Sequence, residues 1–589
     1  MAPNSVVDVL VIGAGPAGLM CAYNLAQAGV KIRIVDQRQE RMLKGQADVI
    51  QVRGIEILDS LNLASKIIPS SYHSYAFTTY RGNSDGSISR TIRADAHYGI
   101  ESRYRFTANN SQSFIEGVFR DALASGEKII RGLSFEPEKG LKYTPRSVFV
   151  EQGVRPASLV FHNENEAAYP VEVELKDSKG NTEFVKAKYV IGCDGAHSWT
   201  RAQLGIEMVG ENSDSTWGLV DVSVDTDFPD IRNMTVVENN GRRAVVVPRE
   251  NDSVRFTVQL TDAEVGKDPV TGRVNRTKVT EEKLLQIVKD VFKPYRIDFI
   301  GKTWWHGVYV VGQRLASAYE GGNGRAFIVG DACHTHSPHA GQGMNAALSD
   351  GHNLAWKLVH VLRGWAGPEL LHTYEQERRA FAKDLIHLHE RIAEAMSGKV
   401  KGTNADIISN SLGFVCGTSI QYEPTCLTDL SGQVLAKGIP IGQRLPHQVI
   451  LRVADCRPYS THDLLQCDFR YTVLLFTGDI KLAIQHEALE AFLQGLGSDR
   501  TMFKTLRRFS KKETCEYTDV PKDGRSHWDT VFVDDTAYTA SDGGGAAYRS
   551  LGIVAQGCAV VVRPDGHVAM ITELGRDGGK KIERFLRCK

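Results

Sequence analysis

The sequence lacks three features that would point to common functional classes. No uninterrupted apolar run in its 589 residues reaches the roughly 18 residues of a membrane span. Its 70 Lys and Arg residues balance 70 Asp and Glu residues, so there is no net charge to attract nucleic acid or an anionic membrane. None of the 10 cysteines forms a C-x-x-C pair, which argues against a zinc ribbon or a dithiol redox site. We therefore expect small molecules, rather than nucleic acid or membrane, as partners.

The sequence also has little that resembles a targeting signal. A predicted strand begins almost at the N-terminus and leaves no room for a signal peptide. The C-terminal Arg587-Cys588-Lys589 matches neither a peroxisomal nor a prenylation signal. The scattered cysteines are typical of reduced, buried thiols. We expect a cytoplasmic protein of two or three domains, since 589 residues are too many for one core.

The most informative segment that is present is a glycine-rich turn near the N-terminus. Apolar residues from Val6 to Ile12 predict a buried strand, and Gly13, Gly15 and Gly18 follow in the pattern G-x-G-x-x-G. A helix is predicted over residues 17–28, and a second strand over 31–35 ends at Asp36. Strand, glycines, helix, strand and acid occur in the order of a dinucleotide-binding unit, in which the acid binds a ribose.

Two later strands also end in an acidic residue. One runs into Asp194 and Gly195, and the other runs through Gly330 into Asp331. An aspartate in this position can bind a ribityl hydroxyl. A helix is predicted to open with the N–H groups of Gly343, Met344 and Asn345, so its positive end can face an anionic flavin ring. These segments favour FAD over a nicotinamide dinucleotide as the bound cofactor. The alternative is that Asp331 only caps the segment that follows it.

With these motifs the chain resembles the single-component FAD-dependent aromatic hydroxylases, and among them the phenol hydroxylase type. The resemblance covers nearly the whole chain, and the run from Lys44 to Arg53 points to the phenol hydroxylase branch. It implies an α/β, Rossmann-like FAD-binding fold of the p-hydroxybenzoate hydroxylase kind, an interleaved substrate sheet and a C-terminal thioredoxin-like domain. It also implies hydroxylation through a flavin C4a-hydroperoxide, ortho to a phenol hydroxyl, with NADPH or NADH and O2 as co-substrates.

The resemblance also assigns residues to the two ligands. Asp48 is implied to lie beside the substrate hydroxyl, and Gln112 is implied to contact the flavin. The remaining residues expected to bind the cofactor are Ala17, Gln37, Arg38, Gln46, Pro338, Gly341, Gly343, Met344 and Asn345. No second G-x-G-x-x-G marks a nicotinamide site, and the sequence does not distinguish NADPH from NADH.

The chain divides into three zones. We assign residues 1–204 and 321–400 to the FAD-binding domain, built on a mostly parallel sheet, and residues 205–320 to a substrate-binding sheet domain. Within the latter, residues 244–248 and 254–260 are predicted to be neighbouring antiparallel strands, and residues 281–292 a helix. Residues 401–430 are predicted to be a linker. Residues 431–589 resemble a thioredoxin-like domain without C-x-x-C, whose expected role is packing or subunit contact in a homodimer.

Asp48 is the candidate catalytic residue. A phenol ring becomes a good nucleophile when its hydroxyl loses a proton, and a carboxylate within hydrogen-bond reach can accept that proton. Spacing alone favours a simpler interpretation, in which Asp48 pairs with Arg53 or caps a helix. The resemblance reverses that preference.

Three further residues are candidates for contact with the substrate. Arg249 and Arg255 lie on the predicted pocket strands and would stabilise a phenolate or the flavin, although a surface ion pair with Glu250 or Asp252 is nearly as good an interpretation. Thr257 stands where the phenol hydroxylase pattern has a tyrosine. Either another tyrosine (Tyr104, Tyr295 or Tyr309) supplies that hydroxyl, or a wider pocket admits a bulkier or carboxylated ring.

Other interpretations remain open at the level of sequence. His334, His336 and His339 have a spacing that metal ligands can have, but they fall in the loop expected beside the flavin, and we predict no metal. An FAD oxidoreductase that does not hydroxylate, or a flavin-binding protein without catalysis, would carry the same cofactor motifs. The first would release hydrogen peroxide with every substrate, and the second would not be reduced by NAD(P)H.

Overall fold

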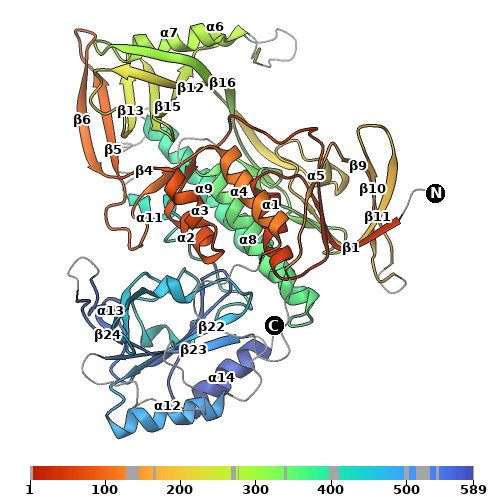
Figure 1. The fold of residues 1–589 in the computed structure, drawn as a ribbon, viewed down its shortest axis with the longest axis vertical. Coiled ribbons are helices and arrows are strands. Elements are labelled where there is room, and N and C mark those ends of the chain that lie inside the picture. Colours follow the sequence, from red (N-terminus) through yellow and green to blue (C-terminus); the bar gives the residue numbers. More distant parts are fainter. Residues whose placement is uncertain are drawn as a thin grey trace.

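Three large sheets organise the protein. The computed structural model describes residues 4–127, 145–163, 167–266, 274–275, 278–336, 341–396, 410–496, 503–511, 531–538 and 543–587. In Figure 1 the nucleotide-binding motifs lie in the middle of an elongated molecule, a second sheet lies at one end and a C-terminal α/β unit lies at the other. The fold is α/β, as predicted.

The first sheet carries the predicted nucleotide-binding unit. Strand β1 (Asn4–Ile12) runs parallel to β11 (Thr182–Gly192) on one side and to β2 (Ile32–Asp36) on the other. The parallel order continues to β18 (Ala326–Ile328) beyond β11 and to β8 (Val150–Gln152) beyond β2. The antiparallel strands β9 (Arg155–Phe161), β10 (Val171–Lys176) and β17 (Glu320–Gly321) complete it. The three predicted acid-ending strands, β2, β11 and β18, therefore belong to one set of parallel strands in the same sheet, with β1 between β2 and β11.

Helices cover this sheet and bury its core. Helix α1 (Pro16–Gln27) packs against α8 (Gly343–Leu362) and α4 (Gln112–Ser125), because all three have apolar faces buried in one cluster. The long helix α9 (His372–Met396) packs on α8. Shorter helices are α2 (Val52–Ser60), α3 (Ala64–Ile67), α5 (Trp199–Gln203) and α11 (Leu412–Val415), and a small sheet joins β3 (Val49–Ile50), β7 (Thr107–Asn109) and β4 (Tyr72–Ser74).

The second sheet has the order β19-β16-β12-β15-β14-β13-β5-β6. Its centre is a pair of long antiparallel strands, β12 (Met208–Thr226) and β16 (Ile297–Ala316). The predicted neighbours are confirmed, since β14 (Arg242–Pro248) pairs antiparallel with β15 (Ser253–Leu260). The predicted helix forms as α7 (Glu281–Val291), after the short α6 (Asp262–Val265). The remaining strands are β13 (Met234–Asn239), β19 (His334–Thr335), β5 (Ala76–Gly82) and β6 (Ile88–Asp95).

The C-terminal unit has a thioredoxin-like order of elements, as predicted. Its sheet runs β21-β20-β24-β23-β22-β25-β26, in which β22 and β23 are parallel and β25 and β26 are antiparallel to their neighbours. Buried clusters lie on both faces of the sheet, and α12 and α14 pack on each other. The bounds are β20 (Val449–Arg452), β21 (Pro458–Ser460), β22 (Tyr471–Gly478), α12 (Ala483–Gly495), β23 (Phe503–Lys511), β24 (Val531–Asp534), α13 (Ala547–Ser550), β25 (Cys558–Val562), β26 (Val568–Thr572) and α14 (Arg576–Arg587).

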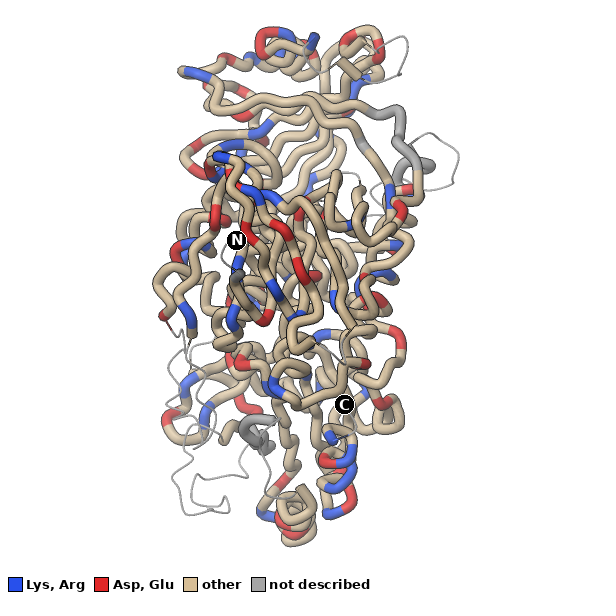
Figure 2. The backbone as a smooth tube through the Cα atoms, turned by 90° about the vertical axis from the view of Figure 1, so that its right-hand side faces the viewer, with Lys and Arg blue, Asp and Glu red and all other residues tan. Residues whose placement is uncertain are grey.

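Buried ion pairs join this unit to the helices of the first sheet. Arg563 donates to Glu377 of α9 at 2.9 Å, and Asp565 accepts from the indole N–H of Trp356 on α8 at 3.0 Å. On the surface, by contrast, Figure 2 shows acidic and basic residues interspersed along the tube. Among the described helices, none is long and apolar enough to cross a membrane.

Candidate active site

The turn after β1 has the geometry that its glycines predict. Gly13 has φ +101°, and a Cβ atom there would lie 2.3 Å from the Cys193 carbonyl oxygen. A Cβ atom on Gly18 would lie 1.9 Å from the Gly13 carbonyl oxygen. Gly15 has no neighbouring atom within 4 Å of a built Cβ, and it borders a cavity. Gly13 and Gly18 therefore allow close packing of backbone, whereas Gly15 keeps space open above the turn.

The three strand-ending aspartates do different things. Asp36 is buried and accepts hydrogen bonds from the N–H groups of Ala14 at 2.8 Å and Arg38 at 2.9 Å, so it holds the glycine turn. Asp194 accepts from the N–H and hydroxyl groups of Thr200 at the start of α5, whose N-cap residue is Ser198. Asp331 is exposed to the cavity, and no described residue donates a hydrogen bond to its carboxylate. The alternative in which Asp331 is only a cap is therefore not what the structure shows.

The start of α8 borders the same cavity. Gly341, Gly343 and Met344 line it, and the first N–H groups of a helix have no partner within the helix. Asn345 is different, because its side chain is buried and binds other protein groups. Its amide accepts from the N–H of Gln51 at 2.9 Å and donates to the carbonyl of Val49 at 3.0 Å, which fixes β3 to α8.

The cavity is large enough for more than one ligand. It measures about 2320 Å³, whereas a pocket for one drug-sized molecule measures roughly 300–1000 Å³. At one end it is lined by the glycine turn and by Ala17, Gln37, Arg38 and Asp194. At the other end it is lined by strands of the second sheet, with Phe77, Leu219, Val245, Val247, Thr257 and Val308. A dinucleotide and a second, mostly apolar molecule fit this shape.

Asp48 lines the cavity and contacts Arg255 of the second sheet. Its side chain is 11% exposed and borders the cavity together with Gln46 and Gln112. The segment before it is held in place, since the Ala47 N–H donates to the Gln112 side-chain oxygen at 3.2 Å and the Gln112 N–H donates to the Ala47 carbonyl. The backbone carbonyl of Asp48 accepts from the N–H of Asn110 at 2.9 Å.

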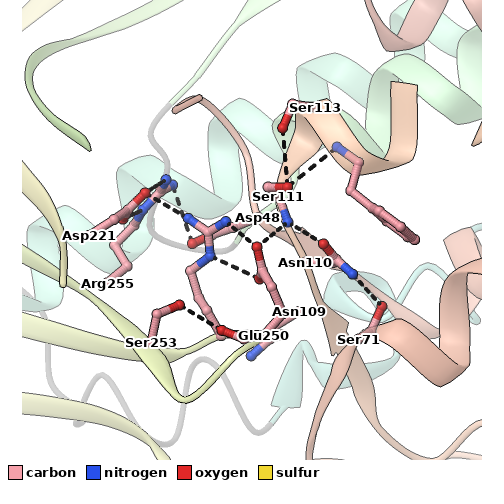
Figure 3. A network of polar contacts seen from close by, with 12 residues as sticks. Asp48, Ser71, Asn109, Asn110, Ser111, Ser113, Asp221, Glu250, Ser253 and Arg255 are labelled. Atoms are coloured by element: carbon pink, nitrogen blue, oxygen red, sulfur yellow. Dashed lines mark hydrogen bonds and ion pairs between the residues drawn. The ribbon is translucent and has the colours of Figure 1, made fainter. Parts of the chain in front are cut away.

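The neighbour of the Asp48 carboxylate is Arg255 (Figure 3). Arg255 Nη1 lies 3.2 Å from Asp48 Oδ2, but this nitrogen donates its hydrogen bond to the Gln46 carbonyl, and Asp48 Oδ2 accepts none. Burial raises the pKa of Asp48 above its usual range, although the positive charges of Arg255 and Arg249 act in the opposite direction. A buried carboxylate that borders a cavity and has a raised pKa is suited to accept a proton.

Both arginines are buried, so the interpretation as surface ion pairs is wrong. Arg249 does pair with Glu250 at 2.9 Å, as that alternative suggested, but the pair is 5% and 17% exposed and Arg249 also binds Asp221 at 2.7 Å. Arg255 binds Asp221 at 2.6 Å. The alternative partner of Asp48 is wrong as well, because Arg53 binds Glu56 and the Asp565 carbonyl.

Comparison with known proteins identifies the family. A family model described as "FAD binding domain" matches residues 6–389, and one described as "Phenol hydroxylase, C-terminal dimerisation domain" matches residues 420–588. The chain belongs to the FAD-dependent aromatic monooxygenases. This agrees with the resemblance found in the sequence.

Named relatives of this monooxygenase span its whole length. It is 31% identical to the FAD-dependent monooxygenase terD of Aspergillus terreus, over 100% of this chain and 97% of the relative. It is 31% identical to the phenol 2-monooxygenase fsqG of Aspergillus fumigatus (96% and 93%) and 31% identical to the 3-hydroxybenzoate 4-monooxygenase of Comamonas testosteroni (99% and 95%). The solved structure of the flavin-dependent monooxygenase PieE with FAD and substrate has the same fold, with TM-score 0.71 and 19% identity over 100% of both chains.

The cavity of this monooxygenase fits FAD by its own geometry. Gly15 leaves open space above the turn, Asp331 presents a carboxylate without a hydrogen-bond donor, and the first turn of α8 offers free N–H groups. These are the groups that a pyrophosphate, a ribityl hydroxyl and an electron-rich ring require. The predicted contact at Pro338 lies outside the described residues.

The structure also narrows the remaining sequence alternatives. Of the three tyrosines considered as a substitute at position 257, only Tyr309 lines the cavity. Thr257 lines it too, on β15. His334 binds the Asp350 carboxylate at 2.9 Å in a buried pair, so that histidine has a structural partner.

One residue of the site, Asp221, was missed by the sequence analysis. Asp221, the shared partner of both arginines, lies between Val220 and Val222 in an apolar stretch of β12, and that position was the available signal. Trp305 lines the cavity under Arg255, with 5.3 Å between the guanidinium carbon and the ring centre. A Cβ atom on Gly45 would lie 2.5 Å from the Trp305 ring, so the ring packs directly on the segment that leads to Asp48.

Proposed function

We propose that this monooxygenase hydroxylates a phenolic ring, ortho to the phenol hydroxyl, and that Asp48 accepts the proton of that hydroxyl. The observation that carries the proposal is the Asp48 carboxylate, which borders the cavity with one oxygen free of hydrogen bonds. The 31% identical relative that is named as a phenol 2-monooxygenase supports it.

We assign the cofactor to the end of the cavity with the glycine turn. Gly13, Gly15 and Gly18 would admit the pyrophosphate, Asp36 a ribose and Asp331 the ribityl chain, with Gln46, Gln112 and the start of α8 around the flavin ring. Bound FAD supplies the redox chemistry: NAD(P)H reduces it, and O2 then provides one oxygen atom to the ring and one to water. The balance is phenol, O2, NAD(P)H and one proton giving diol, NAD(P)+ and water.

The protein groups near the ring act on its charge. A carboxylate that accepts the hydroxyl proton makes the ring more electron-rich at the ortho carbon. Arg255 lines the cavity beside Asp48, and its positive charge would favour the phenolate without a direct hydrogen bond, whereas Arg249 does not line the cavity.

The charges of the site favour a phenol without a carboxylate. Arg249 and Arg255 are each bound to acidic side chains, Glu250 and Asp221, so neither is left to pair with a carboxylate on the substrate. Thr257 and the apolar strand residues beside it leave room for a ring system larger than phenol. A bulky, uncharged phenol is therefore the substrate class we favour over a hydroxybenzoate.

We also propose that the C-terminal domain joins two copies of the chain. The family model for residues 420–588 is described as a dimerisation domain. Sedimentation of the purified protein at several concentrations would test this, because a monomer at all concentrations would contradict it. We also keep the predicted domain bounds as proposals: 1–204 with 321–400, 205–320 and 431–589. Strands β5 and β6 lie within the first of these ranges but pair with the substrate sheet.

The experiment that tests the function is a screen of phenols for stimulated NAD(P)H oxidation. We expect some uncharged, extended phenols to increase the rate and to give a product heavier by one oxygen atom. Hydrogen peroxide in amounts equal to the NAD(P)H consumed, with every phenol, would instead show an FAD oxidase.

A further inference from the structure

Asp221 is the shared partner of the two arginines. It is 4% exposed, on β12, and is the register partner of Arg255 on β15. An ionised carboxylate in a buried strand is stable only when positive groups and hydrogen-bond donors surround it. Asp221 is therefore stable in this strand because Arg249 and Arg255 surround it, and its effect on these arginines bears on the site.

Asp221 binds Nε and Nη2 of Arg255, the two nitrogens that together bind a carboxylate most firmly. Arg255 Nε lies 2.6 Å from Asp221 Oδ1, and Arg255 Nη2 lies 2.8 Å from Asp221 Oδ2 (Figure 3). This is the two-point geometry in which a guanidinium binds a carboxylate most firmly. Only Nη1 is left, and it donates to the Gln46 carbonyl.

Asp48 consequently has an ion contact with Arg255 but accepts no hydrogen bond at Oδ2. The ion contact is 3.2 Å long and involves one nitrogen. The charged groups that face Asp48 are Arg255, Arg249, Asp221 and Glu250, two positive and two negative. The arginines lower the pKa of Asp48, whereas Asp221 and Glu250 raise it.

We infer that Asp221 is a positioning residue that holds Arg255 by two hydrogen bonds and thereby prevents Arg255 from binding both oxygens of the Asp48 carboxylate, which borders the cavity. Without Asp221, the guanidinium of Arg255 is free to turn its two-point face to Asp48. A carboxylate bound in that way is a weaker base. The inference rests on the proposed function, in which Asp48 accepts the substrate proton.

The test compares Asp221→Asn with Glu250→Gln. Each variant removes one negative charge that raises the pKa of Asp48, but only Asp221 binds Arg255. In Asp221→Asn we expect the rise of kcat/KM with pH to move to lower pH by about one unit or more, because Arg255 turns to Asp48. In Glu250→Gln the shift should be clearly smaller. Equal shifts in both variants would overturn the inference, since charge alone would then explain them.

A binding measurement makes the test independent of turnover. The dissociation constant of an uncharged phenol is measured against pH on the oxidised holoenzyme without NAD(P)H. The pH at which affinity changes should move down in Asp221→Asn and stay near the wild-type value in Asp221→Glu, which restores the carboxylate. An unmoved transition in Asp221→Asn that retains FAD and thermal stability would contradict the inference. Wild-type enzyme that binds phenols but gives no oxygenated product would contradict the proposed function instead.

Discussion

At the scale of single residues, the basicity of Asp48 is set by where its neighbours donate their hydrogen bonds. Arg255 stands beside it, yet the Arg255 nitrogen nearest to Asp48 donates its hydrogen bond to the Gln46 carbonyl. Gln46 itself has a left-handed backbone conformation, with φ +66°. Burial then outweighs the arginine charges and raises the pKa of Asp48. The acid is consequently a better proton acceptor than an exposed aspartate would be.

The first residue-scale prediction concerns pH. Because Asp48 must be ionised to accept a proton and its pKa lies above the usual range, kcat/KM should rise with pH through that raised pKa and be low below it. In Asp48→Asn this rise should disappear. The matched control is Asp95→Asn, which removes a cavity-lining acid paired with an exposed arginine, Arg105, and should keep the wild-type profile. A rise that persists in Asp48→Asn would assign the titration to another group.

The second residue-scale prediction concerns Thr257. Thr257→Tyr adds a ring to the cavity wall and should lower kcat/KM for bulky phenols roughly tenfold, the effect of about 1.4 kcal/mol of crowding. Turnover of plain phenol should be unchanged or better. Steady-state kinetics with matched small and large phenols measures this. Bulky phenols that react as before would show that Thr257 does not set the pocket width.

At the scale of elements, the glycines of the β1–α1 turn have two different roles, close backbone packing and open space for a ligand. A Cβ atom on Gly18 would collide with the backbone of Gly13, whereas a Cβ atom on Gly15 would meet only the cavity. Gly18→Ala should therefore destabilise the apoprotein by about 1–3 kcal/mol, the cost of overpacking. Gly15→Ala should leave the apoprotein Tm unchanged and weaken FAD binding about tenfold or more, or by about 1.4 kcal/mol.

Thermal unfolding of the apoprotein and fluorescence titration with FAD distinguish the two variants. Equal loss of apoprotein stability in both would mean that Gly15 is a packing glycine. Unchanged FAD affinity in Gly15→Ala would place the pyrophosphate elsewhere.

The element scale also shows what sequence could and could not predict. The local apolar pattern predicted helix α7 to within one residue of its observed end. The apolar runs that end in a glycine turn or an acid predicted the parallel strands β1, β2, β11 and β18. The pairing of β5 with β13 escaped prediction, because it joins segments about 150 residues apart, and no local pattern encodes such a partner. Asp48 was found through family resemblance, whereas Asp221 acts through contacts that only the folded sheet creates.

At the scale of the whole molecule, buried charges tie the C-terminal domain to the helices of the FAD-binding region. Arg563 reaches Glu377 of α9, and the same carboxylate binds Lys357 of α8 at 2.8 Å. All three side chains are at most 1% exposed. Since α8 opens at the flavin end of the cavity, the C-terminal domain supports the element that borders the cofactor site.

The molecule-scale prediction compares two links between the same regions. Arg563→Met leaves Glu377 buried with one partner fewer and should destabilise the protein by about 3–5 kcal/mol. Arg103→Met breaks the partly exposed pair with Asp463 and should cost about 1 kcal/mol or less. Thermal unfolding, monitored through FAD release and through protein absorbance, measures both. Equal and small effects would show that the buried pair does not hold the regions together.

The measurement that tests the central claim most directly is oxygen transfer from labelled O2 by wild type and by Asp48→Asn, with the best phenol of the screen. We predict close to one labelled oxygen in the product for each NAD(P)H consumed by wild type. The variant should keep its FAD and form product at least about 100-fold more slowly, the effect of losing a general base. Equal rates of labelled product from both proteins would show that Asp48 is not the group that activates the ring.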